Sequence, residues 1–398
     1  MNFNYDVCVV GAGPVGSTIS YYLSLKGLSV ALLDKKTRIG YPLQCAGILS
    51  SHIKDYNELP ENLIINKVRG AFLHSPNQIL KVKKSGDAAY VIDRVAYDQF
   101  LLKRAVDSGV ELINQKAIDF DIDKGLTMLQ DNHVIKSRII VGCDGYNSNL
   151  SNHMGNSQSN YAASQMLVEI TSDEINSFRK SDAPNIKGYV DAGMFDNILP
   201  GFFWIIPTVD DLYRVGLFSN DSHKKQDLIL WNFLKDNFKF EIIEKYKGFI
   251  PMFNKDNKMV KSRAILIGDA AGQIKPTSGG GLLIAFDACK FASEYIFEAI
   301  EKDDLSILGK YHEEFMNRYK KEFSYQIKVQ KTLHLLSDDD LDYLFLKLKE
   351  NDGEELISEY GDMDNQSRLV KESIKRGLVF KVLPSFLFKN VVKIFGFR

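Results

Sequence analysis

The chain has 398 residues, of which 45% are hydrophobic, and its formal net charge at pH 7 is −1. A chain of this length buries more than one hydrophobic core, so we expect two or three lobes. Its nearly balanced charge produces no general positive field, which argues against nucleic acid as a partner.

The four cysteines are expected to be reduced thiols that hold no metal. They stand at positions 8, 45, 143 and 289, without a CxxC pair and without clustering with the seven histidines. The sequence also enters its first strand without a signal segment and contains no apolar run long enough to span a bilayer. These features predict a cytoplasmic protein.

The strongest local signal is a strand, a turn and a helix at the start of the chain. An apolar run at residues 7–10 leads into Gly11-Ala12-Gly13-Pro14-Val15-Gly16, and a helical segment follows. In this GxGxxG pattern Gly11 permits a tight turn, Gly13 lets the backbone approach a pyrophosphate, and Gly16 lets the helix pack closely on the strand. The pattern predicts a dinucleotide site.

A second strand at residues 28–33 ends in Asp34, at the spacing of a carboxylate that accepts hydrogen bonds from ribose hydroxyls. The charge of Asp34 would repel a ribose phosphate, which disfavours NADP. A helix is expected at residues 96–106. Alternating or aromatic-rich segments at 165–170 and 202–206 predict an antiparallel sheet, and the later chain is mostly helical.

A further strand and turn stand late in the chain, where an apolar run leads into Gly268-Asp269-Ala270-Ala271-Gly272. The triplet Gly279-Gly280-Gly281 then precedes an apolar helical stretch at residues 282–300. From the residues alone, this strand, turn and helix can hold polar ligand atoms.

These residues resemble the second flavin fingerprint of the FAD-dependent hydroxylase and reductase superfamily. The resemblance implies that Asp269 binds the ribityl or pyrophosphate region of FAD and that the glycines approach the isoalloxazine ring. Residues 139–148 resemble the Asp-Gly motif of the same superfamily, which implies that Asp144 and Gly145 support the ribityl and pyrophosphate region.

Within this superfamily the chain is similar to geranylgeranyl reductases, especially the archaeal enzymes that saturate the isoprenoid chains of membrane lipids. The similarity covers nearly the whole chain and rests on residues 39–47, 91–94, 202–207, 268–272 and 276–281. It implies FAD as the cofactor, with Arg94 as a charged hydrogen-bond donor. The motifs and the resemblance together assign to FAD the residues Gly11, Gly13, Val15, Gly16, Asp34, Cys45, Ala46, Ile48, Arg94, Ala117, Asp144, Gly145, Asp269, Gly280, Gly281 and Leu282.

Phe202, Phe203 and Trp204 are the candidate substrate-contacting residues. The family pattern Tyr-x-Trp-x-Phe-Pro reads here as Phe-Phe-Trp-Ile-Ile-Pro, so a tyrosine hydroxyl that could anchor a polar part of the substrate is missing. A buried sheet face without ligand contact is the alternative, because aromatic residues at alternating positions are ordinary core residues. The resemblance places Cys45 beside the flavin ring, as a candidate catalytic residue or as a residue that only packs there.

The expected fold is α/β, with a Rossmann-type FAD-binding domain interleaved with an antiparallel-sheet substrate domain and followed by a helical C-terminal region. We expect the FAD-binding domain in residues 1–65, 90–155 and 258–300, the substrate domain in residues 66–89 and 156–257, and the helical region in residues 301–398.

The C-terminal segment suggests contact with a membrane surface. From Arg368 to Arg398 it carries eight Lys or Arg and one acidic residue among Leu, Val, Ile and Phe. Basic amphipathic segments bind anionic membranes through apolar burial and charge attraction. The alternative is a tail that packs on the body of the protein with solvated lysines.

The resemblance implies an FAD-dependent reductase that saturates isolated double bonds of geranylgeranyl or other prenyl chains, such as those of archaeal-type membrane lipid precursors, by hydride transfer from reduced FAD. Because the sequence has no second GxGxxG unit for a nicotinamide, we expect an external electron donor such as ferredoxin. Two alternatives stay open. One is an FAD-dependent monooxygenase or halogenase acting on an aromatic or quinone substrate, and the other is a prenyl-binding protein without flavin, against which the intact motifs argue.

Overall fold

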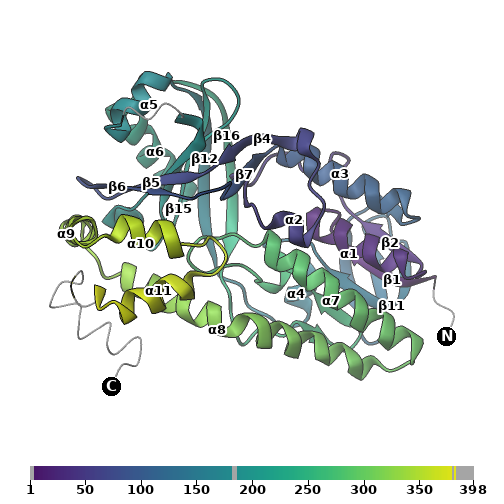
Figure 1. Cartoon of the computed structure of the whole chain (residues 1–398). Helices are drawn as coiled ribbons and strands as arrows, with labels where there is room; N and C mark the ends of the chain where they lie inside the picture. The colour runs from purple at the N-terminus through teal and green to yellow at the C-terminus, as the bar shows by residue number, and fades with distance from the viewer. Residues whose placement is uncertain (1–3, 182–185, 379–380, 382–398) are drawn as a thin grey trace.

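The computed structural model describes residues 4–181, 186–378 and 381. It has two halves, each built on a sheet (Figure 1). Helices α1, α3 and α7 lie with the first half, α5 and α6 lie with the second, and the long helix α8 runs along the lower side of the view. This arrangement matches the predicted α/β class with interleaved segments.

The first sheet has the strand order β17-β18-β11-β1-β2-β8, and β9 and β10 extend from β11. Strands β18, β11, β1, β2 and β8 are parallel to one another. Parallel strands covered on both faces need nearly continuous apolar runs, and β1 and β2 have them. The strands are β1 (Tyr5–Val10), β2 (Val30–Leu33), β8 (Glu111–Ile113), β9 (Ala117–Asp121), β10 (Leu126–Leu129), β11 (Val134–Gly142), β17 (Val260–Lys261) and β18 (Ala264–Leu266).

The second sheet has the order β16-β12-β15-β14-β13-β5-β6. It is antiparallel as predicted, except that β13 and β5 run parallel. A smaller sheet, β3-β7-β4, packs against its inner face through the cluster that joins Val68 and Val91 to Trp204. The strands of both sheets are β3 (Ile48–Ser50), β4 (Ile64–Val68), β5 (Gly70–His74), β6 (Ile79–Lys83), β7 (Ala89–Ile92), β12 (Asn160–Glu169), β13 (Tyr189–Gly193), β14 (Phe203–Pro207), β15 (Leu212–Ser219) and β16 (Glu241–Pro251).

The helices cover the sheets and close one open edge. Helix α1 packs against α3 and α7, and α10 packs against the edge strand β6. There the N–H groups of Lys81 and Lys83 donate to Glu354 (2.6 Å) and Ser358 (3.0 Å) of α10, so this edge is not free to pair with another chain. The helices are α1 (Pro14–Leu25), α2 (Ile53–Tyr56), α3 (Arg94–Asp107), α4 (Asn149–His153), α5 (Ser172–Arg179), α6 (His223–Asn237), α7 (Leu282–Glu301), α8 (Gly309–Leu333), α9 (Asp338–Glu350), α10 (Gly353–Tyr360) and α11 (Gln366–Lys375).

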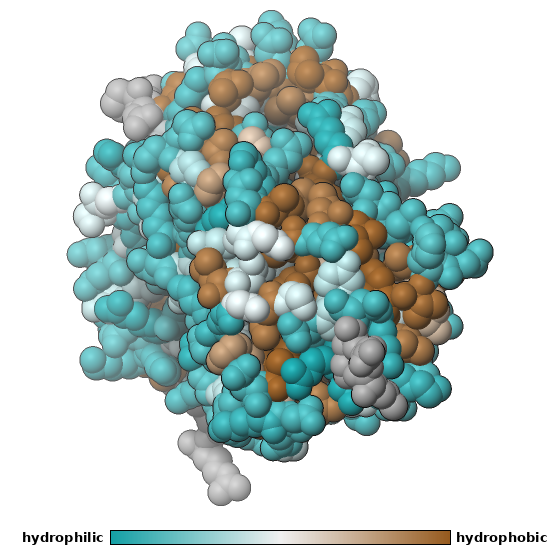
Figure 2. Space-filling model, turned by 90° about the vertical axis from the view of Figure 1, so that its right-hand side faces the viewer, coloured by the Kyte–Doolittle hydropathy of each residue, from teal (hydrophilic) through white to brown (hydrophobic). Residues whose placement is uncertain are grey.

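The surface is mainly hydrophilic, and the face in Figure 2 carries a patch of hydrophobic residues near its middle. Among the described residues, none of the helices combines the length and the apolar character that crossing a membrane requires. The C-terminal segment for which we expect membrane contact lies largely outside the described residues, which end with Leu378 and Lys381.

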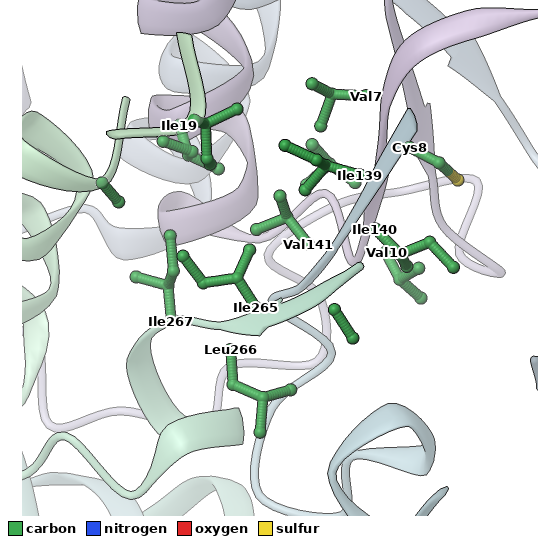
Figure 3. Packing of buried hydrophobic residues seen from close by; sticks show 14 of the residues in the cluster. Val7, Cys8, Val10, Ile19, Ile139, Ile140, Val141, Ile265, Leu266 and Ile267 are labelled. Atoms are coloured by element: carbon green, nitrogen blue, oxygen red, sulfur yellow. The ribbon is translucent and has the colours of Figure 1, made fainter. Parts of the chain in front are cut away.

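The core of the first half holds its parallel strands in register. Val7 of β1 lies opposite Ile139 of β11, and Val141 of β11 lies opposite Ile265 of β18 (Figure 3). Ile19 of α1 packs against the same cluster, so the helix that follows the glycine turn is fixed to the sheet. Each of these side chains is fully buried. This packing sets the position of the loops at the carboxyl ends of the strands.

Candidate active site

The polar residues that the sequence singled out meet at one edge of the first sheet. Gly11 follows β1, Asp34 follows β2, Asp144 follows β11, and Asp269 lies just beyond β18. Because these strands are parallel neighbours, their carboxyl ends share an edge. Open α/β sheets bind ligands at this edge.

Of the three glycines in the turn, only one has open space next to it that a ligand could occupy. A Cβ at Gly11 would clash with the carbonyl oxygen of Cys143, and a Cβ at Gly16 would overlap the carbonyl oxygen of Gly11. A Cβ at Gly13 would meet nothing within 4 Å. The packing of the chain therefore requires glycine at the first and third positions, whereas the open space at Gly13 fits a pyrophosphate at the uncapped N-terminus of α1.

Asp34 is held in place by backbone groups. Its Oδ2 accepts a hydrogen bond from the Ala12 N–H (2.8 Å), and its Oδ1 accepts one from the Lys36 N–H (2.8 Å). These bonds fix the carboxylate beside the glycine turn, where its remaining lone pairs can accept hydrogen bonds from ribose hydroxyls.

Asp144 and Gly145 form the turn after β11. Asp144 Oδ2 accepts a hydrogen bond from the Asn149 N–H (2.8 Å), so the carboxylate also holds the start of α4. Burial raises the pKa of Asp144. Gly145 has a positive φ of 84°, and a Cβ there would meet nothing within 4 Å.

Arg94 links three parts of the site. It is the first residue of α3, is buried, and pairs with Asp98 at 3.0 Å. Burial lowers the pKa of Arg94, but its attraction to Asp98 and its contact with the Cys45 thiol outweigh burial and raise the pKa above its usual range. Burial raises the pKa of Asp269 to about 6, against the attraction of Arg94. The structure thus brings Cys45, Arg94 and Asp269 together.

A second guanidinium group, from Arg214 of β15, approaches the Cys45 loop. Its Nη1 donates to the carbonyl oxygen of Ala46 (2.9 Å), and a Cβ at Gly47 would overlap the same nitrogen. Burial lowers the pKa of Arg214, and its interaction with Cys45 opposes that shift. Cys45 therefore lies near two buried arginines, Arg94 and Arg214, of which Arg94 is paired with Asp98.

A cavity of about 590 Å³ begins beside these residues and extends across the inner face of the second sheet. Apolar side chains from the sheet and from the C-terminal helices supply much of its wall. Lining residues include Cys45, Ala46, Ile48, Gly280, Gly281 and Leu282 near the sheet edge, Phe202, Trp204 and Phe218 on the sheet, and Ile357, Met363 and Leu369 from α10, α11 and the loop between them.

Phe203 corrects one of the substrate assignments. Successive residues of a strand point to opposite faces, so Phe202 and Trp204 face the cavity while Phe203 faces away from it. Phe203 packs against Phe195 and Phe233 with ring centroids 5.3 and 4.8 Å away. It is a core residue of the opposite face and not part of the cavity wall.

The remaining candidate residues lie around the same edge. Val15 of α1 packs against Gly268. A Cβ at Gly268 would lie only 3.1 Å from the Cγ2 atom of Val15. Ala117 begins β9 and is buried in the core of the first half. Gly281 occupies the N-cap position of α7 but has no side chain that could cap it, and Leu282 is the first residue of the helix. The N-terminus of a second helix without a side-chain cap therefore lies at the cavity.

One group of possible metal ligands occurs in the described part of the chain, although the sequence indicated none. Ligand atoms of His52, Asp362 and Asp364 lie within 4.8 Å of one another. Asp364 is paired with Lys275 at 2.8 Å, so a cation of this chain already neutralises part of the charge that a metal ion would need.

Sequence reasoning missed three contributions to the site. Arg214 stands in the predicted sheet domain without any motif, Gln158 donates to the backbone oxygen of Asp269 (2.7 Å), and α10 and α11 supply part of the cavity wall. The one signal in the sequence was an arginine within an apolar run, Leu212–Ser219, because such a position is often buried and a buried arginine needs a partner.

Two family models match the chain. The model described as FAD dependent oxidoreductase matches residues 6–80, and the model described as tryptophan halogenase matches residues 50–327. The sheet edge, the glycine turn and the acidic residues around the space at Gly13 agree with these matches. Together they define an FAD-dependent oxidoreductase, with FAD as its cofactor.

Relatives narrow this class. Digeranylgeranylglycerophospholipid reductase 1 of Methanococcoides burtonii is 31% identical over 371 residues, which cover 88% of this chain and 89% of that protein. The chain belongs to the digeranylgeranylglycerophospholipid reductase family, and its residues 50–327 also match the family that the tryptophan halogenase model describes.

Two solved structures show the same fold. A geranylgeranyl bacteriochlorophyll reductase-like protein from Thermoplasma acidophilum aligns with a TM-score of 0.81 and 22% identity over 98% of both chains. A mutant of halogenase PltM in complex with FAD aligns with a TM-score of 0.68 and 18% identity over 89% of this chain and 81% of that chain. At these identities the likeness concerns the fold alone, and it confirms the predicted fold class.

Proposed function

We propose that this protein saturates isolated double bonds of geranylgeranyl or other prenyl chains, with archaeal-type membrane lipid precursors as substrates. The observation that carries the proposal is the largely apolar cavity that starts beside Cys45 and Gly281 and continues along Trp204. A flexible, uncharged chain can lie in such a cavity through burial of apolar surface.

The residues assigned to FAD in the sequence analysis form the cofactor part of this proposal. When bound, FAD supplies hydride chemistry. Gly13 and the N-terminus of α1 would hold its pyrophosphate, Asp34 a ribose, and Asp269 the ribityl or pyrophosphate region. Gly280, Gly281 and Leu282 lie where the cavity reaches the sheet edge.

The chain itself aligns the substrate and excludes water. An isolated alkene is poorly activated, so each double bond must be held in a fixed position against the cofactor. Phe202 and Trp204 provide a rigid aromatic wall for that purpose. Cys45, which lies near Arg94 and Arg214 and lines the cavity, is the candidate catalytic residue.

The test is reduction of a prenyl substrate by the purified flavoprotein. With a chemical reductant and without oxygen, geranylgeranyl-bearing lipids should gain hydrogen pairs, which mass spectrometry detects. Cys45→Ala should slow this turnover while FAD stays bound. An enzyme that binds FAD but leaves every prenyl double bond intact would contradict the proposal.

The match of residues 50–327 to the tryptophan halogenase model favours a second candidate, an FAD-dependent monooxygenase or halogenase acting on an aromatic or quinone substrate. The same assay separates the two functions. Product formation that requires oxygen supports the second candidate, whereas saturation of a prenyl chain without oxygen supports the reductase.

The proposal includes partners and location. An electron donor is required, and we propose an external one such as ferredoxin. We place the protein in the cytoplasm, in peripheral contact with the inner face of the membrane that holds its substrate. The proposed domains are the FAD-binding segments 1–65, 90–155 and 258–300, the substrate-binding segments 66–89 and 156–257, and the helical region 301–398.

A further inference from the structure

A row of side chains crosses the floor of the cavity at one level of the second sheet. Antiparallel pairing places Tyr246 opposite Gln165, Gln165 opposite Gly216, and Gly216 opposite Trp204. Directly opposite residues share a face of the sheet. Tyr246, Gln165 and Trp204 all line the cavity, so a side-chain amide stands between two aromatic rings in its floor.

The Trp204 ring is fixed from two sides. A Cβ at Gly216 would lie 2.5 Å from Cζ2 and 2.6 Å from Cε2 of Trp204, so the indole lies directly over the glycine. The ring thereby reaches across β15 to β12, where its Nε1 donates a buried hydrogen bond of 2.9 Å to Gln165 Oε1. Glycine at position 216 makes this reach possible.

This hydrogen bond determines which atom of the Gln165 amide remains without a hydrogen-bond partner. The indole N–H can only donate, so the amide oxygen of Gln165 must face it and the amide nitrogen must point elsewhere. Within the described part of the chain, that nitrogen has no hydrogen-bond partner. Gln165 as a whole is only 5% exposed, but its amide nitrogen is not among the fully buried unpaired atoms, and the residue lines the cavity. An unpaired donor that is accessible from a cavity is available to a ligand.

We propose that Gln165 determines substrate specificity by donating a hydrogen bond from its amide nitrogen to an oxygen at the head of the prenyl substrate. This inference rests on the proposed function, because it uses the same cavity. An ether, an alcohol and a phosphate ester all present such an oxygen, whereas a hydrocarbon presents none. The bond fixes how deeply the chain enters the cavity, and Trp204 keeps the amide in the donating orientation.

The test compares wild type with Gln165→Met, which keeps the length of the side chain and removes the donor. The substrates are geranylgeraniol, geranylgeranyl diphosphate, a geranylgeranyl ether and a hydrocarbon of equal chain length. We expect the ratio of kcat/KM for each oxygen-bearing substrate to that for the hydrocarbon to fall about tenfold or more in the variant. A ratio that stays at the wild-type value overturns the proposal. The three oxygen-bearing substrates show which head group the site accepts.

Trp204→Phe is the second variant, because it removes the indole donor and leaves the amide free to turn. We expect it to lower the kcat/KM ratio less than Gln165→Met does, because the amide donor is still present. If both variants instead lower turnover of all substrates by the same factor, Gln165 acts only by fixing the ring, and the proposal is overturned. FAD absorbance checks that each variant carries its cofactor.

A binding measurement separates failure of this inference from failure of the proposed function. The chain has two tryptophans, so a Trp231→Phe background leaves Trp204 as the only tryptophan reporter of ligand binding. If the wild type reduces none of the four substrates, the proposed function fails. Binding of geranylgeraniol that is about tenfold weaker after Gln165→Met then still supports the hydrogen bond, and equal binding overturns it.

Discussion

At the scale of single residues, Gly13 and Gly16 show how one motif combines two different requirements. Gly13 has φ −65°, which any residue can adopt, and a Cβ there meets nothing within 4 Å. We therefore predict that Gly13→Val folds but loses FAD, because the side chain occupies the space for the pyrophosphate. Flavin absorbance and thermal unfolding test this. Gly16→Val is the control that should fail to fold, and a Gly13→Val protein with full FAD occupancy would refute the assignment.

Asp269 gives a prediction about pH. Burial raises its pKa from 3.8 to about 6 in the flavin-free chain. Between these values the unfolded chain releases the proton while the folded chain keeps it, so the free energy of unfolding falls as pH rises and levels off above the folded pKa. The full penalty is about 3 kcal/mol. Asp269→Asn should therefore stabilise the flavin-free protein relative to wild type at pH 8 but not at pH 3.5.

Urea unfolding of the flavin-free protein at the two pH values measures this difference. The same substitution should weaken FAD binding, because it removes a charged hydrogen-bond acceptor. Equal stability of variant and wild type at pH 8 would show that the Asp269 carboxyl is not destabilised by burial.

At the scale of elements, β14 separates two functions on its two faces. Phe202 contacts Trp204 and Phe218 on the cavity side, whereas Phe203 is 2% exposed on the opposite side. Phe203→Ala should lower the free energy of unfolding by roughly 3–5 kcal/mol through a cavity in the core. Phe202→Ala should instead raise KM for prenyl substrates with a smaller loss of stability. Denaturation and steady-state kinetics on the two variants test both predictions. A larger loss of stability in Phe202→Ala and a larger rise of KM in Phe203→Ala would show that Phe203, and not Phe202, faces the substrate.

At the scale of the whole molecule, α10 and α11 line the cavity and precede the segment for which we propose membrane contact. Helix α11 lies against α8, and Leu378 is buried beside Leu356. A truncation after Lys381 therefore keeps the described helices. We predict that it abolishes sedimentation with anionic vesicles, because it removes basic residues that each contribute about 1 kcal/mol near an anionic surface, together with several phenylalanines.

Salt should weaken the binding of the full-length chain to the same vesicles by screening these charges. Bound FAD and turnover of a short soluble prenyl analogue should persist in the truncated protein. If the truncation instead releases FAD or unfolds the chain, residues after Lys381 belong to the body of the protein and the membrane interpretation is wrong.

The sequence by itself determined the dinucleotide site and the fold class, and the family resemblance added FAD as the ligand. The glycine turn, Asp34 and the late Gly-Asp segment are short and contiguous, and each sits at the end of an apolar strand. Parallel strands carry their carboxyl ends to one edge, so local patterns were sufficient to place these residues together.

Only the tertiary structure decided what surrounds the substrate. Because successive residues of an extended chain point to opposite faces, the sequence shows that Phe202 and Phe203 face opposite sides. It does not show which of them meets the cavity, because that depends on which face α5 and α6 cover. Arg214 reaches Ala46, and Trp204 reaches Gln165, across separations of 168 and 39 residues. Such contacts depend on how sheets and helices stack, and no local pattern in the chain encodes them.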